Sequence, residues 1–259
     1  MTAGGSTWVV RRKPWSGVRL RLLCFPWAGV GPAVYRQWAD AVPPDIEVGA
    51  ILLPGHEARL REAPFTRLEA LVDALAAGLR AHMDLPFAMF GHSMGALVAF
   101  HVACRLRDEG AGEPVHLFVS GRRAPQLPPR HPPIAHLADA QFVEEVRRRY
   151  NGIPDEVLRH PDLLALLVPT LKADMAVIES YVHREGAPLE CPISVYGGVD
   201  DPEATPAELA SWRVHTRGPL SVRMFPGAHF FVQTAQPDLL RAVRDELALI
   251  ADRARGGRS

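Results

Sequence analysis

Short apolar runs alternate with longer helical patterns along most of this chain of 259 residues, and few architectures accommodate such an alternation. Strands are predicted at 18–25, 47–53, 87–90, 115–120, 193–196 and 221–225. Helices are predicted over about 33–42, 68–82, 95–109, 206–215 and 237–253, and the pattern Thr66-x-x-Glu69 predicts a capping box at the start of the second helix. Because helix-length segments separate the strands, and several strands are apolar on both faces, we predict an α/β fold with a mostly parallel central sheet flanked by helices.

One long segment, residues 122–190, departs from this alternation. It has no convincing strand pattern, five prolines fall between Pro125 and Pro133, and helical patterns cover 138–150 and 163–181. The economical interpretation is a helical lid of residues 122–190 inserted into an α/β core made of 1–121 and 191–259. An insertion at the carboxyl ends of the strands would lie over the crevice where open α/β sheets bind their ligands.

Charge and cysteine content narrow the class of protein. Lys plus Arg and Asp plus Glu both total 29, and a formal net charge of zero argues against a nucleic-acid-binding protein. The three cysteines are widely spaced without a C-x-x-C pair, so neither a disulfide framework nor a zinc knuckle is expected. No metal site is expected either, because the chain lacks an H-E-x-x-H motif, and His131 and His136 lie in a proline-rich loop without acidic or thiol ligands at useful spacing.

Two features bear on membranes and location. Residues 1–17 lack the basic-then-apolar layout of a signal peptide, so we expect a cytoplasmic protein. The longest stretch without a charged residue, 85–104, has the length of a membrane span. Gly91, Ser93 and Gly95 interrupt it, and we interpret it as a buried strand that runs into a buried helix. No membrane association is expected.

The stretch from Phe87 to Phe100 carries the chemistry. It reads as a strand, then Gly-His-Ser-Met-Gly, then a helix of small and apolar residues. In this context G-x-S-x-G predicts a nucleophile elbow, in which the serine lies at a strained turn between strand and helix and the glycines allow close approach of the chain. A chance match is the alternative, but the strand before the motif and the helix after it argue against chance. Ser93 is the predicted nucleophile.

A serine hydroxyl needs a histidine base and usually a carboxylate that orients the base, here in the chain order Ser, then Asp or Glu, then His. His229 fits this order, because it follows the strand 221–225 and precedes the last helix. The alternative for His229 is a histidine that only packs in a loop. His92 lies inside the elbow and is expected to point away from a partner across the sheet. Most other histidines are interpreted as ordinary surface or packed residues: His82, His101, His131, His136, His160, His183 and His215.

The carboxylate is expected in the loop after the preceding strand, where Asp200 and Asp201 are neighbours. Only one can face the imidazole, and the pattern Gly198-x-x-Asp201-Pro202 favours Asp201, which leaves Asp200 as a solvated turn residue.

The oxyanion hole is expected from two backbone N–H groups. Met94, directly after the nucleophile, supplies the first. The loop 24–31 ends a strand and supplies the second, from Ala28 or alternatively Trp27. This loop lacks the glycine spacing and the Lys-Ser/Thr pair of a phosphate-binding loop.

Six segments, taken in order, resemble those of type II thioesterases, the free-standing editing enzymes of polyketide synthases and nonribosomal peptide synthetases. They are Phe25-Pro-Trp-Ala-Gly29, Leu53-Pro-Gly-His56, Phe90-Gly-His-Ser-Met-Gly95, Val119-Ser-Gly-Arg-Arg-Ala-Pro125, Gly197-Gly-Val-Asp-Asp-Pro202 and Phe225-Pro-Gly-Ala-His-Phe230. The resemblance runs from about residue 8 to about residue 250. The chain departs from the family pattern at Val30, where a second glycine is common, and this departure bears on the second oxyanion donor.

The resemblance implies a triad of Ser93, Asp201 and His229 and an α/β-hydrolase fold with a helical lid. It also implies that the substrates are acyl groups on the phosphopantetheine arm of an acyl or peptidyl carrier protein. Beyond that arm no cofactor is expected, and we expect a monomer. Apolar lid residues would shape an acyl chamber or would only pack the lid helices together: Phe142, Leu163, Leu164, Leu167 and Met175. Arg122 and Arg123 suggest a docking site for an acidic carrier, although exposed arginines are usually only solvated.

Two other functions stay open. The same triad could hydrolyse other acyl esters, lactones or acyl-coenzyme A, which assays of carrier, coenzyme A and ester substrates would distinguish. A hydrolase-like scaffold without activity could instead bind an acyl carrier. Labelling by a serine-reactive fluorophosphonate separates this binding protein from an enzyme.

Overall fold

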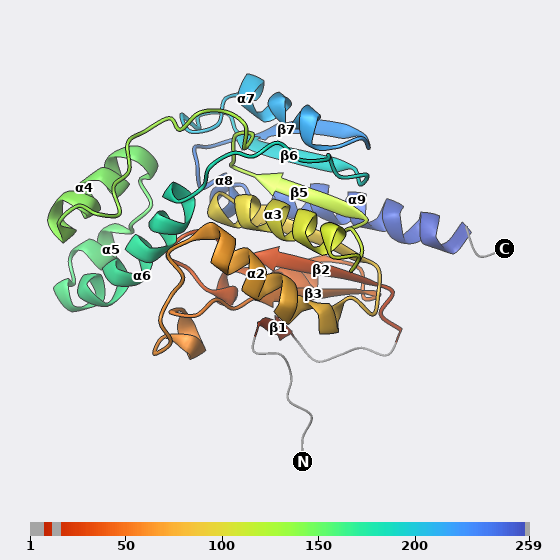
Figure 1. Ribbon diagram of the computed structural model, residues 1–259, viewed down its shortest axis with the longest axis horizontal. Coiled ribbons are helices and arrows are strands. Elements are labelled where there is room, and N and C mark those ends of the chain that lie inside the picture. Colours follow the sequence, from red (N-terminus) through yellow and green to blue (C-terminus); the bar gives the residue numbers. More distant parts are fainter. Residues whose placement is uncertain (1–7, 12–16, 257–259) are drawn as a thin grey trace, which may run out of the picture.

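The computed structural model describes residues 8–11 and 17–256, with side chains described as far as residue 251. Its centre is a seven-stranded sheet in the order β1-β3-β2-β4-β5-β6-β7 (Figure 1). The edge strand β1 (Val9–Arg11) pairs antiparallel with β3. The remaining strands are all parallel: β2 (Leu20–Phe25), β3 (Ile46–Ile51), β4 (Phe87–His92), β5 (His116–Ser120), β6 (Ile193–Gly198) and β7 (Leu220–Phe225). The predicted α/β fold with a mostly parallel sheet is confirmed.

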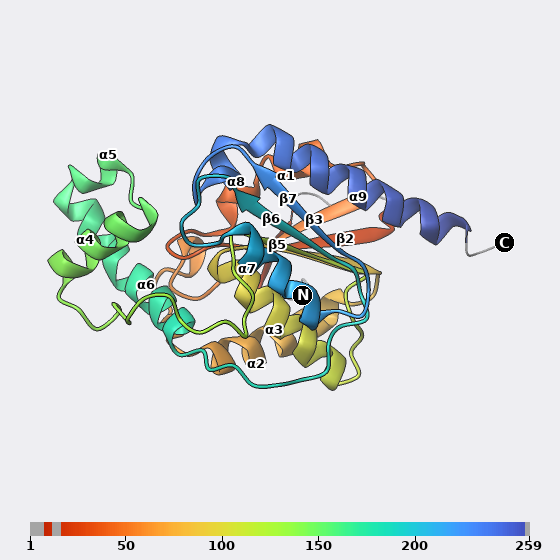
Figure 2. The ribbon, with the colours of Figure 1, turned by 90° about the horizontal axis from the view of Figure 1, so that it is seen from above.

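Helices cover both faces of the sheet, which is why its central strands are buried on both faces. Every residue of β2, β4 and β5 is buried. Helices α2 (Leu68–Leu79) and α3 (Met94–Asp108) lie on one face, and α1 (Trp38–Ala41) and α9 (Gln236–Gly256) lie on the other (Figure 2). Neighbouring residues of a strand point to opposite faces. Leu23 therefore packs in the core beneath α2 and α3, and Leu22 packs in the core beneath α1 and α9.

The chain between β5 and β6 forms a helical projection at the carboxyl ends of the parallel strands (Figure 1). It contains α4 (Asp139–Tyr150), α5 (Asp155–Leu158) and α6 (Pro161–Glu179). These helices have an apolar cluster of their own, in which Phe142 is fully buried and Met175 is 5% exposed. We call α4, α5 and α6 the lid. The predicted helices 138–150 and 163–181 correspond to α4 and α6, whereas α5 was not predicted.

The structure corrects several predicted elements. The predicted helix 33–42 is a 3-10 turn (Pro32–Tyr35) followed by the single turn α1. The predicted helix 68–82 is α2 followed by a 3-10 turn (Arg80–His82), and the helix 206–215 is α7 (Pro206–Ala210) with a 3-10 turn (Ser211–His215). Strand β1, the 3-10 turn Glu57–Arg59 and the turn α8 (Phe231–Thr234) carry no pattern long enough to predict.

The capping-box prediction at Thr66 is wrong. Helix α2 begins after Arg67, and the first N–H of the helix, that of Leu68, is satisfied by the Ser180 hydroxyl at 2.9 Å. Ser180 comes from the end of α6, so a tertiary contact replaces the local cap. A capping box does occur at α7, between Thr205 and Glu208.

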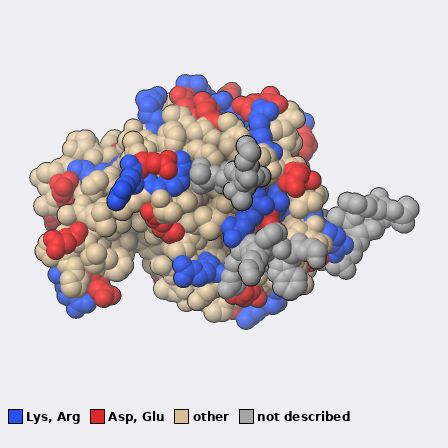
Figure 3. Space-filling model, turned by 90° about the horizontal axis from the view of Figure 1, so that it is seen from below, with Lys and Arg blue, Asp and Glu red and all other residues tan. Residues whose placement is uncertain are grey.

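Within the described residues, no helix is long and apolar enough to cross a membrane. The three cysteines are free thiols, and no group of three His, Cys, Asp or Glu side chains in this part of the chain could hold a metal ion. On the face shown in Figure 3, basic and acidic side chains are interspersed, in keeping with the zero net charge of the sequence.

Candidate active site

Ser93 lies in a strained turn between β4 and α3. Its backbone has φ 53° and ψ −112°, a conformation that non-glycine residues rarely adopt. Glycine is required on both sides, because a Cβ at Gly91 would overlap the backbone of Gly95, and a Cβ at Gly95 would overlap the carbonyl oxygen of Phe25. The N–H of Ser93 donates to the carbonyl oxygen of Ser120 at 2.8 Å, which ties the turn to β5. The local geometry is that of a nucleophile elbow.

The structure brings together the three side chains of the predicted triad. His229 Nε2 lies 3.1 Å from Ser93 Oγ, and His229 Nδ1 lies 2.9 Å from Asp201 Oδ2. Asp201 follows β6 and His229 follows β7, so both loops leave the same edge of the sheet as the elbow. The two residues are 5% and 4% exposed, which shields their hydrogen bond from water.

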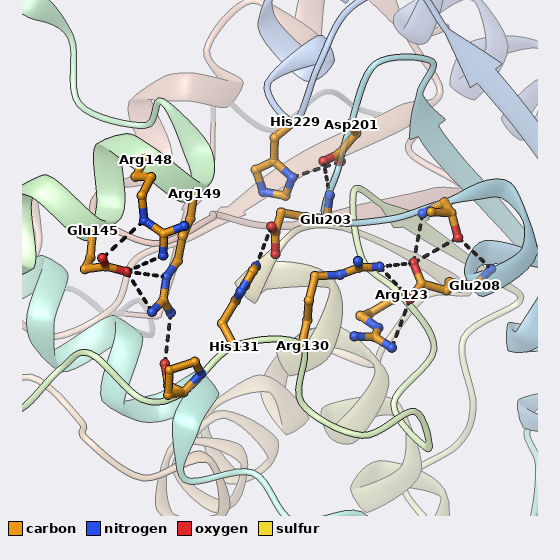
Figure 4. A network of polar contacts seen from close by, with 12 residues as sticks. Arg123, Arg130, His131, Glu145, Arg148, Arg149, Asp201, Glu203, Glu208 and His229 are labelled. Carbon is orange, nitrogen blue, oxygen red and sulfur yellow. Dashed lines mark hydrogen bonds and ion pairs between the residues drawn. The ribbon is translucent and has the colours of Figure 1, made fainter.

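The neighbouring aspartates differ sharply. Asp201 Oδ1 also accepts the N–H of Glu203 at 2.9 Å, so both carboxylate oxygens are held in place (Figure 4). Asp200 is exposed. Of the two candidates for the acid, the geometry selects Asp201.

His92 is buried next to the triad and, contrary to the prediction, its ring does have a partner across the sheet, the Ser120 hydroxyl of β5. Its Nδ1 lies 2.9 Å from Ser120 Oγ, and its ring lies 5.5 Å from the ring of Trp27 and 5.2 Å from that of His229. Burial, with a smaller contribution from His229, lowers the pKa of His92 well below its ordinary value. The imidazole beside His229 is therefore neutral and adds no positive charge that would oppose protonation of His229.

Two backbone segments could form an oxyanion hole. Met94 is the first residue of α3, where N–H groups have no partner within the helix. The loop after β2 packs against Gly95, which places it beside this helix start. In that loop the N–H of Val30 donates to Trp27 O at 3.4 Å, which closes a turn around Ala28.

The N–H of Gly29 is already engaged in this turn, since it donates to the Asp174 carboxylate at 2.7 Å. The second oxyanion donor predicted from the sequence, Ala28 or alternatively Trp27, stays a prediction.

The lid and the segment before α4 contact the site at several points that the sequence did not reveal. The ring of Tyr150 lies 5.4 Å from that of His229. His131, just before α4, lies 2.8 Å from Glu203, which neighbours the triad aspartate (Figure 4). Asp174 of α6 reaches the loop after β2. The only signal in the sequence was that Asp174 is one of two acidic residues, with Glu179, in the mostly apolar predicted helix 163–181.

Other residues singled out in the sequence have mixed outcomes. Arg123 forms an ion pair with Glu208 at 2.9 Å, and Arg122 is partly buried, which lowers its pKa, so neither is a freely solvated cation. His82 and His215 are buried, which selects packed residues from the two interpretations given for them. Phe142 and Met175 pack inside the lid, Leu164 and Leu167 are partly buried, and Leu163 is 50% exposed and lines no interior.

Comparisons with known proteins agree with this site. The thioesterase domain family model matches residues 20–247. The chain is 40% identical over 243 residues to the gramicidin S biosynthesis protein GrsT of Aneurinibacillus migulanus, and the alignment covers 94% of each chain. It is 34% identical over 242 residues to the thioesterase PikA5 of Streptomyces venezuelae, and this alignment covers 93% of this chain and 85% of PikA5.

Solved structures give the same result. The RedJ thioesterase from the prodiginine biosynthetic pathway in Streptomyces coelicolor superposes with a TM-score of 0.83 at 37% identity, over 89% of this chain and 87% of RedJ. The type II thioesterase BorB from the borrelidin biosynthetic cluster superposes with a TM-score of 0.83 at 31% identity, over 95% and 98% of the two chains. The resemblance predicted from the motifs is confirmed: this chain belongs to the thioesterase family, with an α/β-hydrolase fold, and is an enzyme that hydrolyses thioesters.

Proposed function

We propose that this protein is a serine thioesterase that removes aberrant or stalled acyl groups from the phosphopantetheine arm of carrier proteins in a polyketide synthase or nonribosomal peptide synthetase. The observation that carries the proposal is the hydrogen-bonded series Ser93–His229–Asp201 at a strained elbow. Membership of the thioesterase family and similarity to GrsT, RedJ and BorB support the thioester and the biosynthetic setting.

Acylation follows from the geometry. His229 Nε2 takes the proton of Ser93 as Oγ attacks the thioester carbonyl, and the carbonyl oxygen becomes an oxyanion held by the N–H groups of Met94 and Ala28. Collapse of this intermediate breaks the C–S bond, and the proton on His229 passes to the departing thiolate of the phosphopantetheine arm. Asp201 keeps Nδ1–H of the imidazole in place and stabilises the imidazolium.

Deacylation repeats the steps with water. His229 removes a proton from a water molecule that attacks the acyl-serine, and the same N–H groups hold the second oxyanion. The proton returns to Ser93 Oγ as the carboxylic acid leaves. The chain's own groups complete both half-reactions, so we propose that no metal ion or diffusible cofactor takes part.

The lid and the partners belong to the same proposal. The lid would cover the acyl chain of a small acyl thioester, and the carrier domain would present its arm at the carboxyl ends of the strands. We further propose a cytoplasmic monomer that binds carrier proteins and neither nucleic acid nor membranes.

Mass spectrometry of an acylated carrier protein, incubated with the wild type and with Ser93→Ala, tests the function. We expect the wild type to release the acyl group and Ser93→Ala to lose nearly all of this activity. Ser221→Ala is the matched control, because Ser221 is exposed on β7 and its hydroxyl bonds only to Ser194 among the contacts described.

Four results would contradict the proposal. Equal loss of the acyl group with wild type and Ser93→Ala would end the nucleophile assignment, as would fluorophosphonate labelling that survives in Ser93→Ala. Hydrolysis of coenzyme A thioesters or simple esters without hydrolysis of the carrier thioester would favour a general acyl hydrolase. Carrier binding without turnover by the wild type would favour a binding protein.

A further inference from the structure

Three segments that lie far apart in the sequence meet beneath the lid. Asp174 Oδ2, from lid helix α6, accepts the N–H of Gly29 at 2.7 Å and lies 2.9 Å from His56 Nε2. Gly29 belongs to the loop after β2, and His56 belongs to the loop after β3. Asp174 and His56 are 3% and 4% exposed. One buried carboxylate oxygen thus joins the lid to both loops.

The hydrogen bonds of His56 define its charge. Its Nδ1 lies 3.1 Å from the carbonyl oxygen of Pro54, which can only accept, and its Nε2 faces a carboxylate. Both ring nitrogens must therefore donate, so His56 is an imidazolium. Burial by itself would lower the pKa of His56, but the hydrogen bond and charge of Asp174 outweigh it and raise the pKa.

A buried ion pair of this kind is poorly explained by stability alone. The cost of desolvating two charges roughly offsets their attraction, and apolar side chains of similar volume often serve a core as well. The pair does fix the orientation of the Asp174 carboxylate, which can accept the N–H of Gly29 only in one arrangement of the loop.

Helix α6 contacts the same loop at a second point. Leu171, one turn before Asp174 on the same face, has its Cδ1 at 2.9 Å from the position where a Cβ of Gly29 would lie. Gly29 has φ +80° and is the third residue of the turn from Trp27 to Val30. The helix therefore packs directly on Gly29 and holds its N–H, and this fixes the turn that presents the N–H of Ala28.

We propose that Asp174, with its charge balanced by His56, is a positioning residue of the oxyanion hole: lid helix α6 sets the loop after β2 in the conformation that stabilises the oxyanion. This inference rests on the proposed function. It makes the closed lid a condition for catalysis, because the loop loses the carboxylate that holds Gly29 whenever α6 moves away.

Asp174→Ala tests the inference, with Glu179→Ala as the matched control. Glu179 lies on the same helix, and its carboxylate also accepts backbone N–H groups, but those of Ile134 and Ala135 in the segment before α4. Two readouts are needed: kcat and KM with an acyl carrier thioester, and the rate of inactivation by a fluorophosphonate, whose phosphoryl oxygen also needs the oxyanion hole. Thermal unfolding checks that each variant is folded.

We expect Asp174→Ala to lower kcat by about 10- to 100-fold, somewhat less than the loss of an oxyanion donor, with KM changed by less than about threefold. The inactivation rate falls by the same factor. Asp174→Asn, which keeps an oxygen acceptor for the N–H of Gly29, recovers most of both rates. Glu179→Ala stays within about threefold of the wild type in both.

Other outcomes overturn the inference. Folded Asp174→Ala with wild-type kcat and inactivation rate would show that the loop keeps its conformation unaided, and equal losses in Asp174→Ala and Glu179→Ala would show that only general lid order matters. If Asp174→Ala does not fold, the double variant Asp174→Val with His56→Leu removes the acceptor without leaving a buried charge, and the same thresholds apply.

A failure of the proposed function looks different. It appears as turnover that does not depend on Ser93, or as absent turnover in the wild type. The further inference is tested separately, because the ratio of the fluorophosphonate inactivation rates of Asp174→Ala and the wild type requires no assumption about the natural substrate.

Discussion

At the scale of single residues, the site depends on which of two adjacent carboxylates faces the imidazole. Asp201 is buried and bonded to His229 and to the N–H of Glu203, whereas Asp200 is exposed. The two side chains differ by one position in the loop but lie in different dielectric surroundings, so their substitution should have very different effects.

We expect Asp201→Asn to lower kcat by about 10³- to 10⁴-fold with little change in KM, because the amide no longer orients the imidazole or stabilises its charged form. Steady-state kinetics with an acyl thioester measures this. Asp200→Asn is the control and should stay within about twofold. Similar losses in the two variants would contradict the assignment of Asp201.

The elbow glycines give a second prediction at this scale. Gly95→Ala would place a methyl group on the Phe25 carbonyl oxygen, and rigid backbone surrounds it. We expect the free energy of unfolding in urea to fall by about 2 kcal/mol or more. Gly186→Ala, where nothing lies within 4 Å of an added Cβ, should change the free energy by less than about 0.5 kcal/mol. Equal effects would mean that the elbow tolerates the methyl group.

At the scale of elements, the lid has a small apolar cluster of its own, which adjoins the core beneath α2 and α3 through Ala28 and Ile178. Phe142 is fully buried in the lid cluster, while Leu163 on α6 is 50% exposed. Because most of this cluster belongs to the lid helices, we expect the lid to have a lower local stability than the sheet.

Phe142→Ala should therefore act on the lid alone. Truncation of a buried phenylalanine costs about 3–5 kcal/mol, so hydrogen exchange of α4 and α6 should rise strongly while that of β4 and α3 stays unchanged. Leu163→Ala is the control and should leave exchange of all four elements unchanged. Faster exchange throughout the sheet in Phe142→Ala would show that lid and core unfold together.

At the scale of the whole molecule, the ion pair between Asp174 of the lid and His56 of the core depends on pH. The raised pKa of His56 means that its ion pair with Asp174 is fully formed below the ordinary histidine pKa of 6.5 and is lost as the pH rises through the folded-state pKa. The other charged group that raises this pKa is Glu57.

We expect the wild type to have a larger free energy of unfolding than His56→Gln, and we expect this difference to be larger at about pH 6 than at about pH 9. The comparison uses urea unfolding at both pH values. His101 and His215, whose pKa values burial lowers to about 4, titrate in both proteins, so their contribution cancels in the difference. A difference that grows toward pH 9 would contradict the charged state of His56.

Much of the site was readable from local sequence. The strand–G-H-S-M-G–helix pattern identified Ser93, and the chain order placed Asp201 and His229 after later strands, because parallel strands end at one edge of a sheet. The lid helices α4 and α6 were recognisable by their period. Such features depend on residues close together in the chain, where propensity and spacing act directly.

Contacts between segments that are distant in the sequence were decided only by the tertiary structure. The N–H of Leu68 finds its cap on Ser180, strand β1 exists only because the edge of β3 is available, and His56, Asp174 and Gly29 meet across more than a hundred residues. No local pattern records these contacts, because each side chain satisfies a polar group left open by a distant segment. By itself the sequence determined the fold class and the predicted triad. Packing determined how lid helix α6 contacts the loop after β2, because buried polar groups must find partners wherever the folded chain brings them.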